Sequence, residues 1–337
     1  MSSTTSRFSH IYHEPETRNT RLGKHVAEKF PEAIWIPVDH YKDVFNRPGQ
    51  HFQSQKKSMK LILAYKEAPY LYDGSEQAQD FGYTNFTYNT PIANCLYNCD
   101  YCFLQGLYPS GNIVLYVNQE DILEAVDQAI PERSDTSQPL YLALSYNTDL
   151  LGFEHLFPVS RFWIEAARAR SDLEIEIRTK SSNFRVISDI QPDPSILLAW
   201  TLSPDRVYRR YESWTASPKR RLKAARAARD AGWRVRLCID PAIPIEGWES
   251  AYTELLDAVQ SSFQAEELDS FSLGTFRMGL DTFKTIRKQR PDSDLYFQQL
   301  ERKSGLVSLK NEHHQSVVTF IQDRLEEAFP RVPVAVG

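Results

Sequence analysis

The chain has 337 residues, of which 42% are hydrophobic, so it is long enough to bury the core of one large domain with appendages. Its formal net charge of -5 argues against a surface coated in positive charge for non-specific binding to nucleic acid, although a local basic groove is compatible with it. No apolar run approaches the length of a membrane span, and the polar start, Met1 to Ser9, lacks the apolar stretch of a signal peptide. We therefore expect a cytoplasmic protein with no membrane partner.

The first 85 residues are predicted to form an N-terminal α/β appendage. Residues 1–20 show no regular pattern, and we expect them to be frayed. A helical stretch follows from Leu22 to Phe30, and the runs Trp35 to Val38 and Leu61 to Tyr65 have the composition of strands.

From residue 86 onward, strands and helices alternate. Leu173, Ile175 and Ile177 show the period of two that is typical of a strand. The six predicted strands are Phe86–Thr90, Pro139–Ser145, Leu173–Thr179, Ile196–Leu202, Trp233–Asp240 and Asp269–Leu273. Amphipathic helices fall between them, with apolar stripes that begin at Ile122, Phe162, Leu222 and Tyr252.

This alternation is typical of parallel βα units and of the α/β class. Six units predict a partial (β/α)6 barrel over residues 86–290, although an open doubly wound sheet has the same local signature. A last amphipathic helix, Val317 to Phe329, places residues 291–337 in a C-terminal helical extension.

Three of the four cysteines, Cys95, Cys99 and Cys102, lie within eight residues. Clustered cysteines in a large chain point to metal ligation rather than to a disulfide scaffold. The spacing C-x3-C-x2-C, in a loop just after the first barrel strand, lets three soft thiolates converge on one iron–sulfur cube. A four-iron (4Fe-4S) cluster needs four ligands, so three thiolates leave one iron open to chelate S-adenosylmethionine.

Two other interpretations of the cysteines stay open at this point. Structural zinc needs four closed ligands, usually as two pairs, and the further candidates Cys238 and His155 are distant in sequence. Three buried thiols that share no ligand are the remaining alternative.

Several stretches outside the cysteine motif match a known family. They are Tyr12-His13-Glu14-Pro15, Leu22-Gly23-Lys24, Glu28-Lys29-Phe30, Leu104-Gln105, Tyr116-Val117-Asn118, Thr148 to Leu156, Arg178-Thr179-Lys180 and Glu246-Gly247-Trp248. On these and the cysteine motif, the chain resembles the spore photoproduct lyase family of the radical S-adenosylmethionine (radical SAM) superfamily. The similarity covers residues 10–290 and is most specific over 94–156.

The resemblance implies a partial barrel of the radical SAM type, a 4Fe-4S cluster, S-adenosylmethionine and a thymine dimer in DNA as the substrate. It also implies cofactor contacts by Tyr101, Thr148, Lys180, Thr201 and Asp240. These residues lie at or just past the carboxyl ends of successive predicted strands, where such barrels carry their chemistry. A solvated strand end for Lys180, and turn chemistry for Thr148 and Thr201, are the alternative roles.

Two positions depart from the family's pattern. Members that repair the spore lesion have a hydrogen-donating cysteine where this chain has Tyr146. The family's tyrosine after the third cluster cysteine helps to return the hydrogen atom to the cofactor, and here it is Phe103, which has no O–H. A phenol can also supply a hydrogen atom, so Tyr146 is a candidate catalytic residue beside the retained Tyr101. The alternative is an inert packing tyrosine.

A third departure concerns the C-terminal part. The family's basic and aromatic hairpin, which helps to hold the lesion, is expected near Gly305 to Glu312, where this chain has no tyrosine and one lysine. This change bears on the identity of the lesion more than on the radical chemistry.

Residues 206–236 are rich in arginine and lysine, with aromatic residues interleaved. The candidate substrate-binding residues are Arg206, Arg209, Arg210 and Trp214, which we predict in a loop after the fourth barrel strand. Such side chains suit phosphate contact and base stacking around a flipped lesion. The stretch Lys219 to Arg229 is interpreted instead as the charged outer face of a helix.

The leading hypothesis is a radical SAM lyase that repairs a thymine-dimer photolesion in DNA, supplied by an electron donor such as flavodoxin or ferredoxin. A radical SAM enzyme that acts on another nucleotide-type substrate is the enzymatic alternative. A metal-stabilised nucleic-acid-binding protein without catalysis is the non-enzymatic one, and iron and sulfide content separates it from both enzymes.

Overall fold

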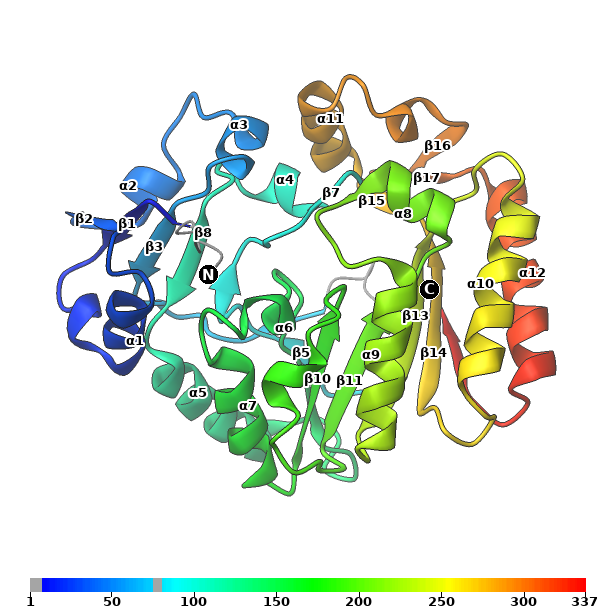
Figure 1. Cartoon of the computed structure of the whole chain (residues 1–337), viewed down its shortest axis with the longest axis horizontal. Coiled ribbons are helices and arrows are strands. Elements are labelled where there is room, and N and C mark those ends of the chain that lie inside the picture. Colours follow the sequence, from blue (N-terminus) through cyan, green and yellow to red (C-terminus); the bar gives the residue numbers. More distant parts are fainter. Residues whose placement is uncertain (1–7, 75–80) are drawn as a thin grey trace, which may run out of the picture.

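The computed structural model describes residues 8–74 and 81–337, and its centre is an eight-stranded sheet (Figure 1). In spatial order the strands are β4 (Tyr72–Asp73), β5 (Phe86–Tyr88), β9 (Leu140–Ala143), β10 (Leu173–Thr179), β11 (Ile196–Thr201), β13 (Arg234–Ala242), β14 (Ser270–Thr275) and β18 (Val334–Val336). The six from β5 to β14 are parallel neighbours. This confirms the six predicted strands and the partial barrel, because the sheet keeps two separate edges, β4 and β18.

Helices cover the outer face of this sheet (Figure 1). They are α5 (Gln119–Glu132), α7 (Val159–Arg168), α9 (Pro218–Asp230), α10 (Trp248–Ser262) and α12 (Asn311–Ala328). On β10 the apolar residues Leu173, Ile175 and Ile177 belong to the same buried core as Trp163 and Ile164 of α7. Because successive side chains of a strand point to opposite faces, the charged residues of β10, Glu174, Glu176 and Arg178, point into the barrel. Between β10 and β11 there is only the short 3-10 helix η2 (Phe184–Ile187).

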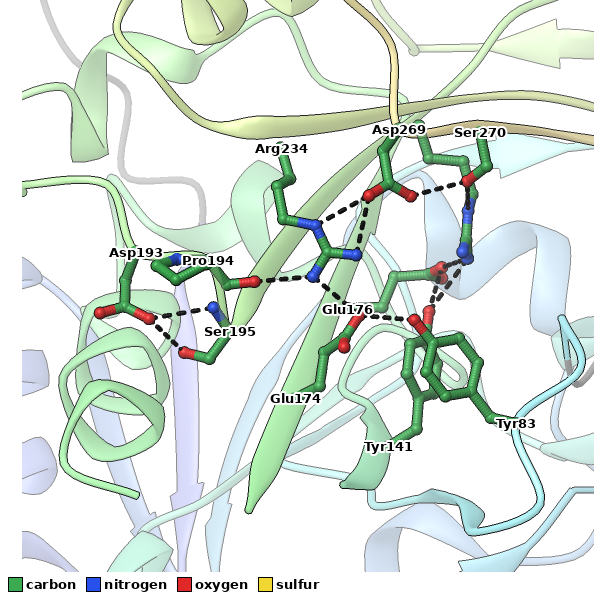
Figure 2. A network of polar contacts seen from close by, with 11 residues as sticks. Tyr83, Tyr141, Glu174, Glu176, Asp193, Pro194, Ser195, Arg234, Asp269 and Ser270 are labelled. Atoms are coloured by element: carbon green, nitrogen blue, oxygen red, sulfur yellow. Dashed lines mark hydrogen bonds and ion pairs between the residues drawn. The ribbon is translucent and has the colours of Figure 1, made fainter. Parts of the chain in front are cut away.

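Charged residues close the barrel at the amino ends of its strands (Figure 2). We call this network the barrel floor; it comprises Tyr83, Tyr141, Glu174, Glu176, Arg234, Arg236, Asp269 and Ser270. Arg236 is 3% exposed and donates to Glu176 at 2.5 Å and to the Ser270 hydroxyl at 2.8 Å. Because each buried charge has an opposite partner, the floor is electrically satisfied without a ligand.

A second sheet lies beside the barrel and has five strands. In spatial order they are β2 (Ile34–Pro37), β1 (His10–His13), β3 (Leu61–Ala64), β8 (Ile113–Tyr116) and β6 (Ile92–Ala93). The short helices near it are α1 (Arg21–Lys29), α2 (Lys42–Phe45) and α3 (Phe52–Lys56), with the 3-10 helix η1 (Thr17–Asn19). The predicted helix at Leu22 and the two predicted strands are confirmed as α1, β2 and β3.

The expectation that residues 1–20 are frayed is wrong for residues 10–13. Ile11 is fully buried and pairs in parallel with Trp35 on one side and Leu61 on the other. The strand is stabilised by two neighbours that are distant in sequence, so its own four residues carry little signal. Residues 1–7 lie outside the described part of the chain.

The domain boundaries at residues 85 and 290 stay a prediction. Both sheets cross the first boundary, because β8 pairs with β3 and β4 pairs with β5. The region after residue 290 is not wholly helical: β18 pairs with β14, and a small sheet contains β15 (Arg277–Gly279), β16 (Leu300–Lys303) and β17 (Leu306–Leu309). Two further elements flank this boundary: α11 (Leu280–Gln289) lies before it, and the 3-10 helix η3 (Asp294–Phe297) lies after it.

The C-terminal hairpin lies earlier than we expected. Its strands are β16 and β17, and its turn has Ser304 and Gly305 at φ 50° and 79°. Glycine tolerates this left-handed conformation at no steric cost, which fixes the turn here rather than further along the chain. Arg302 and Lys303 give β16 two basic side chains, and the hairpin has no aromatic residue.

Across residues 8–74 and 81–337, none of the helices combines the length and the apolar character needed to cross a membrane.

Candidate active site

The cysteine loop follows β5 and returns across the carboxyl ends of the barrel strands. Its short strand β7 (Asn98–Cys99) pairs with β12 (Glu212–Ser213), and α4 (Leu104–Leu107) ends it. Cys99 is buried, and Cys95 and Cys102 are partly exposed. One loop therefore presents the three predicted ligand thiols on the side of the barrel where a βα fold places its chemistry.

Three regions distant in sequence hold this loop in place. The ammonium of Lys56, on α3, donates to the carbonyl oxygen of Cys95. Arg290 donates to the carbonyl oxygen of Asn98 at 3.0 Å and pairs with Asp100 at 2.7 Å. The Tyr296 hydroxyl donates to the carbonyl oxygen of Asp100 at 2.5 Å. These supports could not be predicted from local patterns, because they join residues 39, 192 and 196 positions apart.

The thiols lie in an environment that disfavours uncompensated charge. Burial raises the pKa of all three, that of Cys95 to about 12, and the carboxylate of Asp149 raises the pKa of Cys95 further. The ammonium of Lys56 acts in the opposite direction on Cys95 and Cys102. A bound cluster would supply the positive charge that buried thiolates need, so the donor chemistry fits a metal centre.

Three thiols from one short loop are the donor set that an iron–sulfur cluster uses. Within residues 8–74 and 81–337, no three His, Cys, Asp or Glu side chains gather closely enough to hold one metal ion. In a cubic cluster each thiolate binds a different iron, so the sulfur atoms stand further apart than the ligands of one ion. Structural zinc would need four converging ligands.

A buried ion pair supports Tyr101 beside the cysteines. The Tyr101 hydroxyl donates to Glu212, which pairs with Arg221, and the side chains of this pair are 1% and 0% exposed. Burial would raise the pKa of Glu212, but Arg221 and Lys180 outweigh it and lower this pKa. The carboxylate therefore stays charged and fixes the phenol. We had placed Arg221 on a charged outer helix face, and that is wrong for this residue.

The other predicted cofactor contacts meet at the carboxyl ends of the barrel strands. The Thr148 hydroxyl donates to the carbonyl oxygen of Asn94 at 2.8 Å, next to the first cysteine. The ammonium of Lys180 lies 5.3 Å from the centre of the Tyr101 ring. Asp240 pairs with Arg178 at 3.2 Å and with Arg277 at 3.3 Å.

Thr201 completes this set of predicted contacts. Its hydroxyl accepts from Arg178 at 3.3 Å, which links it to the ion pair of Asp240. The predicted residues thus share one end of the barrel, and their contact with a cofactor stays a prediction.

Several buried polar atoms at this end have no hydrogen-bond partner among the described residues. They belong to Asn89 after β5, Ser145 and Asn147 after β9, and Ser203 after β11, and they make up five of the nine such atoms found. We call these four residues, with Lys180, the barrel mouth. Native structures rarely leave buried polar atoms unpaired unless a ligand or water completes them.

Tyr146 lies against the cysteine loop. Its ring stacks on Tyr88 with centroids 4.1 Å apart and meets the edge of Phe103 at 6.0 Å. Phe103 follows Cys102 directly, so Tyr146 lies beside the loop that carries the three cysteines. The role of Tyr146 in catalysis stays a prediction.

The candidate substrate-binding arginines lie on a helix, α8 (Asp205–Tyr211), and the predicted loop is wrong there. Arg209 pairs with Asp205 and Arg210 pairs with Asp294, while Arg206 is exposed on the same helix. Trp214 is 50% exposed and follows β12, the strand that pairs with Cys99. Of the four, Trp214 is thus tied most directly to the cysteine loop.

Comparison with known proteins adds to this geometry. The family model described as spore photoproduct lyase matches residues 7–335. The chain belongs to the spore photoproduct lyase family. The spore photoproduct lyase of Geobacillus sp. is 25% identical over 300 residues, and that of Bacillus subtilis is 24% identical over 302 residues. In each case the similarity covers 87% of this chain and 85% of the relative.

Solved structures of spore photoproduct lyase share the fold. One, complexed with a dinucleoside spore photoproduct, has a TM-score of 0.82 at 21% identity and covers 98% of this chain and 99% of its own. A variant with bound AdoMet and the dinucleoside photoproduct has a TM-score of 0.83 at 21% identity and covers 97% and 98%. The predicted resemblance is therefore confirmed: this is a family of radical SAM lyases, which use a 4Fe-4S cluster and S-adenosylmethionine.

Proposed function

We propose that this protein is a radical SAM lyase that repairs a thymine-dimer photolesion in DNA. The match of residues 7–335 to the spore photoproduct lyase family carries the proposal, and the loop of three thiols at the carboxyl ends of the barrel strands supports it. When bound, the cluster and S-adenosylmethionine supply a 5′-deoxyadenosyl radical that abstracts a hydrogen atom from the lesion.

The chain's own residues would hold these groups as follows. Cys95, Cys99 and Cys102 ligate the cluster, and their loop is already fixed by Lys56 and Arg290. No carboxylate of the described residues lies in salt-bridge distance of the Lys180 ammonium, so this cation can pair with the carboxylate of the cofactor.

Oxygen atoms at the strand ends and two tyrosines complete the site. Thr148, Thr201 and Asp240 present oxygens to the cofactor. Glu212 accepts a hydrogen bond from the Tyr101 hydroxyl and so fixes the tyrosine ring beside the cysteines. Tyr146 donates a hydrogen atom to the product radical from a ring that already contacts the cysteine loop.

DNA would approach at the barrel mouth. The exposed indole of Trp214 offers a stacking surface for a base that flanks the lesion. Arg206, on α8, and Arg302 and Lys303, on the hairpin, offer positive charge to phosphates. Flavodoxin or ferredoxin is the class of electron donor that suits the cluster, and a reducing cytoplasm suits its thiolates.

The test is a repair reaction under anaerobic conditions. The reconstituted, reduced protein is incubated with S-adenosylmethionine and a DNA strand that carries one spore photoproduct, and thymine and 5′-deoxyadenosine are measured by mass spectrometry. We expect repair that is lost in Cys99→Ala. An unaltered protein that neither repairs the lesion nor forms 5′-deoxyadenosine would refute the proposal.

A second candidate is a radical SAM lyase for another nucleotide-type lesion. The presence of Tyr146 at the donor position and the lack of an aromatic residue in the β16–β17 hairpin favour it. Formation of 5′-deoxyadenosine without repaired thymine, in the same reaction, would support this candidate over the spore photoproduct.

A further inference from the structure

Three tyrosines form a continuous stack at the edge of the barrel. The rings of Tyr146 and Tyr88 are 4.1 Å apart at an interplanar angle of 16°, and those of Tyr88 and Tyr72 are 5.2 Å apart at 23°. All three rings are therefore nearly parallel and in contact. The stack begins beside the cysteine loop and ends on β4, the edge strand of the sheet.

The fold fixes this stack through backbone pairing. Tyr72 and Tyr88 are directly opposite each other in the antiparallel pair of β4 and β5. Tyr88 is level with Ala143 in the parallel pair of β5 and β9, and Tyr146 follows three residues after the end of that register. Cross-strand neighbours lie close enough for their side chains to touch, so the order of the rings follows from strand register.

The phenols of the stack also influence one another electrostatically. Burial raises the pKa of Tyr88, and the neighbouring phenols of Tyr146 and Tyr72 raise it further. All three residues are half-buried, so the stack is not sealed inside the core.

A second ring that contacts Tyr146 cannot supply a hydrogen atom. Phe103 meets Tyr146 edge to face at 6.0 Å and has no O–H bond. A hydrogen atom that is lost from Tyr146 can therefore be replaced from Tyr88 but not from Phe103.

We propose that Tyr88 and Tyr72 form a relay that restores the Tyr146 phenol after it has donated a hydrogen atom to the product radical. This inference rests on the proposed function, since it needs a product radical at the barrel mouth. Tyr88 and Tyr72 are relay residues for the reaction and do not touch the lesion.

The steps balance in atoms and electrons. The Tyr146 O–H bond breaks, a C–H bond forms on the product, and Tyr146 becomes a phenoxyl radical. Tyr88 gives its hydroxyl hydrogen atom to Tyr146 and becomes the radical, and Tyr72 then restores Tyr88 in the same way. A one-electron reductant of the flavodoxin or ferredoxin class supplies an electron to Tyr72, and water supplies the proton.

The direction of the relay has a consequence for the cofactor. The stack runs from the cysteine loop to the edge strand, so the hydrogen atom taken from the lesion is not returned along it. Each repaired lesion should then consume one molecule of S-adenosylmethionine, and the ratio of 5′-deoxyadenosine to repaired lesion should be near unity.

The test compares single and multiple turnovers in Tyr88→Phe and Tyr72→Phe, which keep the rings and lose the hydroxyls. In Tyr88→Phe we expect repair of the first lesion and loss of all later turnovers. Freeze-quenched samples of this variant should show a tyrosyl radical by electron paramagnetic resonance. Its signal should narrow with ring-deuterated tyrosine and be absent from the double variant Tyr88→Phe/Tyr146→Phe.

Tyr83→Phe is the matched control, since Tyr83 also stacks on a tyrosine, Tyr141, at 4.0 Å, but belongs to the barrel floor. It should keep full turnover. Multiple turnovers in Tyr88→Phe at the rate of the unaltered protein, or a 5′-deoxyadenosine ratio far below unity, would overturn the relay. If the unaltered protein does not repair the lesion at all, the result contradicts the proposed function rather than the relay.

Discussion

The two ends of the barrel differ in how their polar groups are satisfied. At the floor, Arg236, Glu176 and Ser270 bind one another, and Arg234 binds Glu174 and Asp269 (Figure 2). At the mouth, buried atoms of Asn89, Ser145, Asn147 and Ser203 have no partner among the described residues. Both ends use the same alternating strands, so the fold alone does not account for the difference.

The contrast indicates at which end of the barrel the chain's own side chains satisfy the buried polar groups. A buried charge is tolerated when an opposite charge and hydrogen bonds surround it, and the floor meets this condition. A buried polar atom without a partner costs free energy in the empty protein, and a ligand that binds it recovers that cost. The floor therefore serves stability, and the mouth serves binding.

The largest effect on stability is expected at the floor. Glu176→Ala leaves the guanidinium of Arg236 buried and without its carboxylate, which should lower the free energy of unfolding by about 3–5 kcal/mol. Thermal unfolding followed by circular dichroism measures the loss. A fall of less than about 1 kcal/mol, the range of an exposed ion pair, would contradict the role given to the floor.

The next effect concerns binding at the mouth. Lys180→Met removes the cation expected to hold the cofactor carboxylate, and a lost charge-assisted hydrogen bond should weaken S-adenosylmethionine binding about 10- to 100-fold. Equilibrium dialysis with the reconstituted protein measures the affinity. The melting temperature should change little, and unaltered affinity would count against Lys180 as a ligand of the cofactor.

The smallest effects come from a matched pair of serines. Ser270, at the floor, accepts from Arg236 at 2.8 Å, so Ser270→Ala should destabilise the protein by about 1–2 kcal/mol. The buried Ser203 hydroxyl, at the mouth, has no partner among the described residues, so Ser203→Ala should leave stability unchanged or raise it by up to about 1 kcal/mol. Equal losses in both variants would show that the two ends do not differ as described.

The elements with strong local patterns were predictable from the sequence. Leu173, Ile175 and Ile177 alternate over a whole strand, and the observed β10 has the predicted bounds. The cysteine spacing likewise placed three thiols in one loop after the first barrel strand, because ligands close in sequence need little help from the fold.

The features that were missed depend on distant partners. The four residues of β1 form a strand because Ile34–Pro37 and Leu61–Ala64 flank them. Arg221 lies in a run of basic residues that resembles a solvated face. It is nevertheless buried, because it pairs with the buried carboxylate of Glu212, which also accepts from the Tyr101 hydroxyl. The tyrosine stack joins β4, β5 and the turn after β9, and no local pattern predicts how these segments pair.

The central claim is that Cys95, Cys99 and Cys102 hold a cluster with one iron open to S-adenosylmethionine. Iron, zinc and acid-labile sulfide should be measured in protein prepared without oxygen, beside Cys99→Ala, together with the electron paramagnetic resonance spectrum of the reduced protein. We predict about four iron and four sulfide per chain, lost in Cys99→Ala, and a spectrum that changes when S-adenosylmethionine is added. One zinc per chain without sulfide, or a spectrum that S-adenosylmethionine leaves unchanged, would contradict the claim.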